Sequence, residues 1–122
     1  MKKLLIAASI ALSASLALAD GDLKPDHSGV MIEATSGNRV ELVAQMDQVA
    51  VYLTNHAGKP IDSKGATGEI TLLSGTEKTK ATLTPAGGNQ LMAKAKAAAG
   101  TKAIVKFTLP GKPAEQVRLT LK

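Results

Sequence analysis

The 122-residue sequence contains no cysteine and no tryptophan, one tyrosine, one phenylalanine and two histidines. The lack of cysteine excludes disulfides and every metal, redox or nucleophile site built on a thiol. The scarcity of aromatic residues argues against single-stranded nucleic acid as a partner, because its binders stack bases on aromatic side chains. Folding must therefore rest on the burial of aliphatic side chains, in a chain long enough for one core.

The first twenty residues, MKKLLIAASIALSASLALAD, are organised like a secretory signal peptide. Lys2 and Lys3 precede a short apolar run, and Ala17-Leu18-Ala19 fits the small-x-small rule for a cleavage point. An uncleaved anchor is the less favoured alternative, because the run is short of the roughly 20 apolar residues that span a bilayer. We therefore predict a signal peptide over residues 1–19, a periplasmic or secreted location and no stable membrane span.

The mature chain divides into a short polar segment and one domain. Residues 20–28, DGDLKPDHS, predict a flexible polar arm. In residues 29–122 apolar side chains recur at every second position, with turn signals such as Gly37-Asn38 and Gly58-Lys59-Pro60 between the runs. The predicted strand segments are GVMIEA, RVELVAQ, QVAVYLT, GEITLLSG, KTKATLTP, NQLMAKAKA, KAIVKFTL and QVRLTLK. This pattern predicts an all-β fold, a single immunoglobulin-like β-sandwich of about seven or eight antiparallel strands.

One segment, residues 91–100 (LMAKAKAAAG), is ambiguous between helix and strand. Alanine and lysine are strong helix formers, and Gly100 is a suitable helix stop. Lys94 and Lys96, however, alternate with Ala93 and Ala95, as on a strand with one wet face. We favour a strand.

Charge is distributed unevenly along the mature chain. Residues 20–62 hold seven acidic and three basic residues, a net charge of −4, and residues 63–122 hold three acidic and ten basic residues, a net charge of +7. Solubility and attraction between the halves is the simplest interpretation. The alternative is an interaction module that binds another exported protein or a polyanion of the cell envelope through basic strand faces such as that of Lys94 and Lys96.

Catalytic patterns are lacking in the sequence. His27 and His56 are the only imidazole bases, and no serine lies in a G-x-S-x-G context. We therefore predict that the protein is not an enzyme.

Metal binding is the chemistry with the most support. His27 follows the acidic residues of the arm, and His56 lies in the loop of YLTNHAGKPID, 29 residues further along. Imidazole suits copper or zinc, and thioether groups such as that of Met31 favour Cu(I). We predict His27, His56 and Met31 as candidate ligands of a copper or zinc ion. A solvated turn position for His56 and gap filling by Met31 are the alternatives.

Two stretches carry a resemblance to a known group: HSGVMIEATSGNRVELVAQMDQVAVYLTNHAGKPIDSKGATGEITLLSG and LTPAGGNQLMAKAKAAAGTKAIV. They resemble small exported proteobacterial proteins that share a His-Gly-Gly start, a VELV strand and a VYLTDHDGKP loop. The chain is more distantly similar to FixH-like and YtkA-like immunoglobulin-type modules and to periplasmic copper-resistance sandwiches. The resemblance implies a role in metal homeostasis. This chain differs at Ser28, at Asn55 and at Ala57, where the pattern has a glycine and two aspartates.

Overall fold

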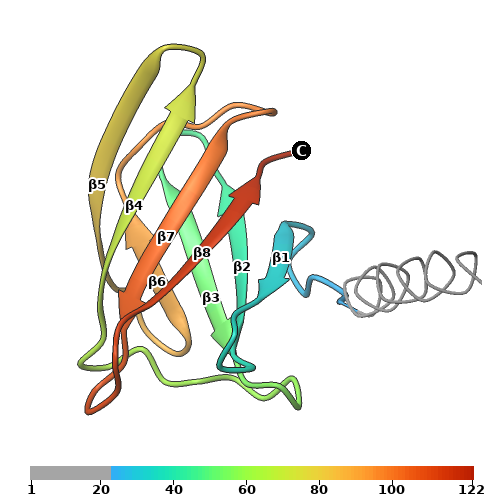
Figure 1. Cartoon of the computed structure of the whole chain (residues 1–122), viewed down its shortest axis with the longest axis vertical. Coiled ribbons are helices and arrows are strands. Elements are labelled where there is room, and N and C mark those ends of the chain that lie inside the picture. Colours follow the sequence, from blue (N-terminus) through green and yellow to red (C-terminus); the bar gives the residue numbers. More distant parts are fainter. Residues whose placement is uncertain (1–22) are drawn as a thin grey trace, which may run out of the picture.

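The computed structural model describes residues 23–122, and every regular element in this part of the chain is a β-strand (Figure 1). The strands are β1 (Val30–Glu33), β2 (Arg39–Ala44), β3 (Val49–Thr54), β4 (Thr67–Ser74), β5 (Glu77–Pro85), β6 (Gln90–Ala93), β7 (Lys102–Thr108) and β8 (Glu115–Thr120). Each of the eight predicted segments overlaps one of these strands, so the all-β prediction is confirmed. Residues 23–122 include no helix long and apolar enough to cross a membrane. The predicted signal peptide, residues 1–19, lies outside the described residues.

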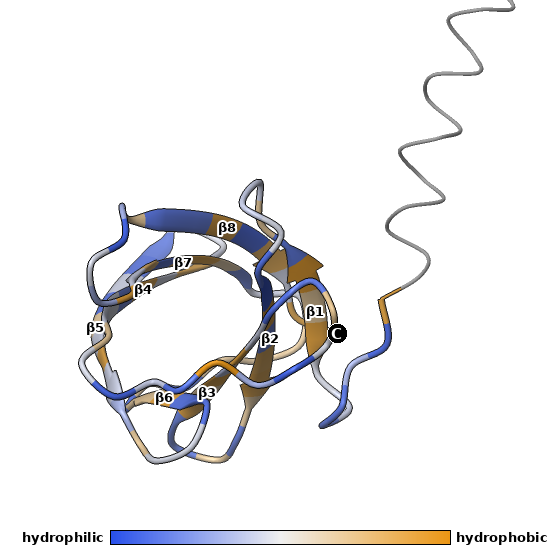
Figure 2. Cartoon of the chain, turned by 90° about the horizontal axis from the view of Figure 1, so that it is seen from below, coloured by the Kyte–Doolittle hydropathy of each residue, from blue (hydrophilic) through white to orange (hydrophobic). Residues whose placement is uncertain are grey.

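All eight strands belong to one antiparallel sheet, in the order β1-β2-β3-β6-β5-β4-β7-β8. The long connection after β3 carries the chain across to β4, and β6 later returns to pair with β3. The sheet curls until its two ends, β1 and β8, lie side by side. Seen from below, the strands form a nearly closed ring, a barrel-like sandwich (Figure 2).

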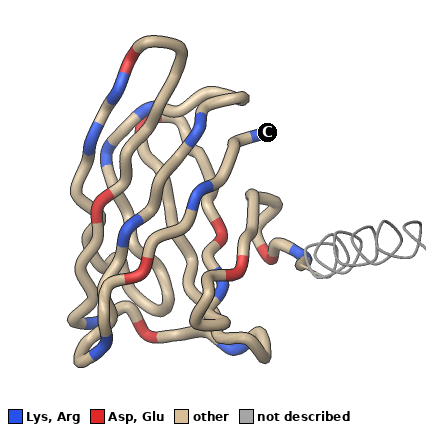
Figure 3. The backbone as a smooth tube through the Cα atoms, in the orientation of Figure 1, with Lys and Arg blue, Asp and Glu red and all other residues tan. Residues whose placement is uncertain are grey.

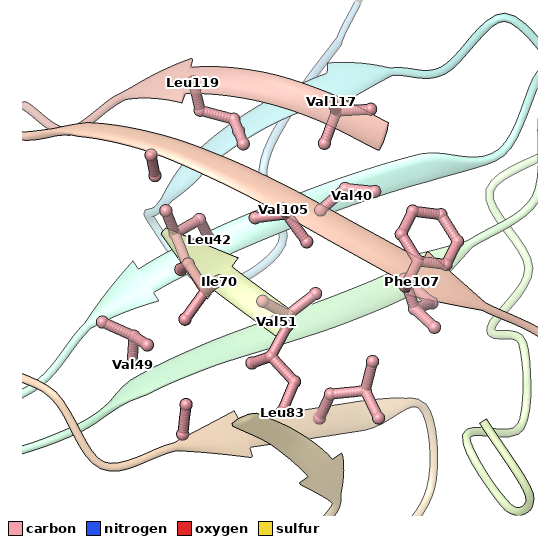
Figure 4. Close-up of a cluster of buried hydrophobic side chains, with 14 of the residues drawn as sticks. Val40, Leu42, Val49, Val51, Ile70, Leu83, Val105, Phe107, Val117 and Leu119 are labelled. Carbon is pink, nitrogen blue, oxygen red and sulfur yellow. The ribbon is translucent and has the colours of Figure 1, made fainter. Parts of the chain in front are cut away.

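The core fills the interior of this ring, because alternate side chains of each strand point inward. Val40 and Leu42 of β2, Val51 of β3 and Val105 of β7 are fully buried, and Phe107 is the largest fully buried side chain (Figure 4). Burying one such aliphatic side chain contributes about 1.5–3 kcal/mol to the free energy of unfolding. The aliphatic core therefore stabilises a chain that has no cysteine for a disulfide.

The ambiguous segment 91–100 is resolved in part as a strand. Strand β6 covers Gln90–Ala93, whereas residues 94–98 are neither strand nor helix, so the predicted strand was too long. Strand β6 ends at Ala93 because its neighbour β3 extends no further in that direction. Ala93 pairs with Val49, the first residue of β3, and beyond that point β6 has no strand left to pair with on that side.

Basic side chains gather on the strands of the second half of the sequence. Exposed basic residues occur on β5 (Lys78 and Lys80), on β7 (Lys102 and Lys106) and on β8 (Arg118). Figure 3 shows how Lys and Arg positions are spread over these strands. Much of the excess of basic residues in the second half of the sequence therefore lies on the outer face of β5, β7 and β8.

Candidate functional site

The two histidines lie on the outer face of β1, β2 and β3, above two neighbouring rows of cross-strand residues. Met31 is opposite Glu41, and Glu41 is opposite Tyr52, which forms the first row. Glu33 is opposite Arg39 in the second row. The rows are two residues apart along each strand, a separation of about 7 Å.

Glu41 is a buried carboxylate that holds the end of the polar arm against the sheet. Its side chain is only 1% exposed. It accepts hydrogen bonds from the backbone N–H groups of Asp26 (3.1 Å), His27 (2.8 Å) and Gly29 (2.9 Å). The fourth contact, 2.9 Å, joins its Oε1 to Nδ1 of the His27 ring. The end of the predicted flexible arm is therefore tied to β2.

These contacts keep Glu41 ionised and fix the tautomer of the neutral His27 ring. Burial by itself would raise the pKa of Glu41, but the hydrogen bonds from the His27 ring and from the Gly29 and His27 amides outweigh it and lower the pKa below its ordinary value. The carboxylate is thus ionised at neutral pH and can only accept hydrogen bonds. It follows that Nδ1 of His27 carries a hydrogen and that the lone pair of the neutral ring is on Nε2.

The His27 ring is also held by an aromatic contact. It stacks on the ring of Tyr52, with centroids 3.7 Å apart and planes inclined by 10°. The His27 side chain remains 42% exposed. One face and one edge of the imidazole are therefore fixed by the protein, while part of the ring stays open to solvent.

Ser28 and Gly29 shape the backbone that brings the amides of the arm and the His27 ring to Glu41. Ser28 has a φ angle of 63° and is the one non-glycine residue of the described chain with positive φ. A side chain on Gly29 would meet the Leu42 carbonyl oxygen at 2.4 Å and Val43 Cγ2 at 2.8 Å. A glycine at the first position would relieve the left-handed backbone, and a glycine at the second is required by close packing. The two positions after His27 therefore both constrain the backbone, Ser28 through its φ angle and Gly29 through close packing.

His56 lies in a tight loop beside the second row. The side-chain oxygen of Asn55 accepts the amide hydrogens of Ala57 (2.9 Å) and Lys59 (3.0 Å), so this position is used to close the loop. Nδ1 of His56 lies 2.6 Å from Oε2 of Glu33. The imidazole is 76% exposed.

Glu33 is shared between His56 and a neighbouring cation. Its Oε2 also lies 3.3 Å from Nε of Arg39. The hydrogen bond from His56 is the main cause that lowers the pKa of Glu33; partial burial opposes it and Arg39 adds to it. The ionised carboxylate again places a hydrogen on Nδ1 of the histidine, so that in the neutral ring the lone pair is on Nε2.

The structure thus gives each candidate histidine a carboxylate of its own and places the two pairs in adjacent rows. Met31 lies beside Glu41, on the side opposite Tyr52. Within residues 23–122 no group of three or more histidine, aspartate or glutamate side chains could hold a metal ion. Sequence reasoning did not single out Glu41, Glu33 or Tyr52. The sequence held one signal for Glu41, namely a carboxylate in the middle of the strand RVELVA, where a threonine or valine is commoner.

A comparison with known proteins found no matching family model, no significantly similar curated protein and no significantly similar solved structure. The family resemblance stays a prediction.

Proposed function

We propose that this protein is an exported, non-enzymatic β-sheet protein that binds a copper or zinc ion weakly through Nε2 of His27. The observation that supports this most directly is the contact between Nδ1 of His27 and the buried Glu41. Histidines that bind metals usually donate their second ring N–H to a carboxylate, which fixes the tautomer and makes the free nitrogen a better ligand. The pair His56–Glu33 repeats this arrangement in the next row.

Copper is favoured over zinc by the position of Met31 in the same cross-strand row as Glu41, the carboxylate that holds His27. The thioether of Met31, next to Glu41 on the same outer face, is a soft ligand of the kind that selects Cu(I). Structural zinc sites use four protein ligands and catalytic ones three, more than the described residues bring together here. A site with one imidazole and one thioether would be completed by solvent or by a partner, which suits exchange or buffering of an ion.

Each histidine ring contacts a glutamate, which is the usual partner of a metal-binding imidazole. In the described chain neither histidine ring hydrogen-bonds to a serine or threonine hydroxyl, and each is paired with a glutamate. An imidazole that activates a hydroxyl needs that hydroxyl within hydrogen-bond reach.

The test is a titration of the purified protein with Cu(I), Cu(II) and Zn(II) by calorimetry. We expect dissociation constants below about 1 mM, the limit at which binding contributes about 4 kcal/mol. His27→Ala should abolish the tightest site and Met31→Leu should weaken Cu(I) more than Zn(II), whereas Met46→Leu, a change at an exposed methionine, should leave binding unchanged. No binding below millimolar, or equal affinity in wild type and His27→Ala, would sink the proposal.

Tyr52 offers a second readout that separates ligation from folding. It is the chain's only tyrosine and its ring is stacked on His27, so copper on His27 should quench its fluorescence. We expect quenching to follow the calorimetric isotherm in wild type and in His56→Ala. Binding without any change in Tyr52 emission would place the ion elsewhere.

A further inference from the structure

Strand β5 has one edge that is largely without a partner. Its residues Glu77–Leu83 pair with β4 on one side. On the other side β5 pairs with β6 only through Thr84 and Pro85. Within residues 23–122, no backbone hydrogen bond joins the remaining edge to the chain that follows β6. The ring of strands is therefore split along most of β5.

A groove follows this open edge. One hollow of about 660 Å³ is bounded by Lys80 and Thr82 of β5 on one wall and by Met92 and Lys94 on the other. A second hollow of about 290 Å³ continues it, between Glu77 and Thr79 of β5 and residues 96–98. Together they follow β5 from Glu77 to Thr84, roughly 25 Å of extended chain.

The side chains along the groove have a regular order. Lys78 and Lys80 point outward from β5. Lys80 lines the groove, whereas Lys78 lies on the adjoining outer face, and Ala81 packs against the core cluster. Lys94 and Lys96 stand on the opposite wall. The one ion pair on that wall, Lys96 with Asp47, is 4.0 Å long and more than three-quarters exposed on both sides, which makes it weak.

We infer that the β5 edge accepts an extended peptide segment as an additional strand, and that this segment carries acidic side chains at alternate positions. An open edge offers a row of backbone donors and acceptors, and strand addition uses them for affinity. Carboxylates on the outward side would lie across from Lys78 and Lys80, and small apolar side chains would lie across from Thr79 and Ala81. The inference does not depend on metal binding at His27.

A second copy of the chain is a poorer occupant of the same edge. Two β5 edges paired with each other would bring lysines from both copies together, and edge lysines discourage such pairing in natural sheets. A partner with the complementary charge avoids this repulsion. The acidic, extended segment of another protein is therefore the occupant that the charges favour.

The probe is a fluorescent eight-residue peptide of alternating valine and glutamate, titrated into the purified protein by anisotropy. We expect saturable binding that weakens with salt, and no binding of the matched valine–lysine peptide. The double change Lys78→Glu and Lys80→Glu should weaken binding about tenfold. Lys106→Glu, on the outward face of β7 and off the edge, is the matched control and should have little effect.

Backbone pairing is tested with N-methylated peptides and hydrogen exchange. An added strand turns alternate N–H groups toward β5, so methylation of one alternate set should abolish binding and methylation of the other should not. Amides of residues 77–83 that exchange fast in the free protein should become protected by the peptide. Equal binding of both methylated peptides, slow exchange of the whole edge in the free protein, or indifference to the lysine changes would each overturn the inference.

Discussion

Nδ1 of His27 lies 2.9 Å from Oε1 of Glu41, a carboxylate whose side chain is 1% exposed. This contact joins a residue of the polar arm to the centre of β2 and accounts for the orientation of the imidazole. It also makes Glu41 the residue on which both the docking of the arm and the candidate metal site depend.

Replacing Glu41 by glutamine should lower the free energy of unfolding by about 3 kcal/mol, because an amide accepts fewer of the four hydrogen bonds and turns donors toward N–H groups. Urea denaturation measures the change. Glu69→Gln, on an exposed position of β4, is the matched control and should shift stability by less than about 0.5 kcal/mol. Equal stabilities of the two variants would contradict the assigned role of Glu41.

The contribution of Glu41 should depend on pH. Because its folded-state pKa lies below the ordinary value of 4.5, the ionised form favours the folded state. The stabilisation is fully present above about pH 4.5 and is lost as the pH falls through the folded pKa. Denaturation at several pH values should show a gap between wild type and Glu41→Gln that is constant near neutrality and shrinks in acid. A gap that persists undiminished to about pH 2 would rule this linkage out.

Ser28→Gly should stabilise the protein slightly. A left-handed backbone costs a non-glycine residue about 1–2 kcal/mol, and the greater freedom of glycine in the unfolded chain returns about 0.5–1 kcal/mol of this. We expect a net gain of about 0.5 kcal/mol, measured by thermal unfolding, with metal binding unchanged. A clear loss of stability would mean that the serine side chain contributes a contact of its own.

Gly29→Ala should have the opposite effect. The added carbon would lie 2.4 Å from the Leu42 carbonyl oxygen, so the arm must move off β2 and the hydrogen bond from the Gly29 amide to Glu41 must lengthen. We expect a loss of about 1–3 kcal/mol. The emission of Tyr52 should change as well, because His27 moves with the arm. Gly87→Ala is the positional control: nothing lies within 4 Å of the added carbon, so any loss of stability there comes from its φ angle of 97°, and the emission of Tyr52 should stay unchanged.

The sequence by itself determined the strands and the core. Period-two alternation places Val40 and Leu42 on one face of β2 whatever the partner strand is, and burial of that face decides the register. It also determined that no disulfide could contribute and that the side chains of His27, His56 and Met31 were candidate metal ligands. These are properties of local pattern and of residue type.

Only the tertiary structure decided what those residues contact. The separation of His27 from Glu41, and of His56 from Glu33, depends on how the arm and a loop fold back over β1–β3, which alternation does not encode. The open edge of β5 is likewise a result of strand order: β6 is only four residues long and leaves most of its neighbour unpaired. Pattern settles which face of a strand is buried, whereas long-range pairing settles which polar groups meet on the outside.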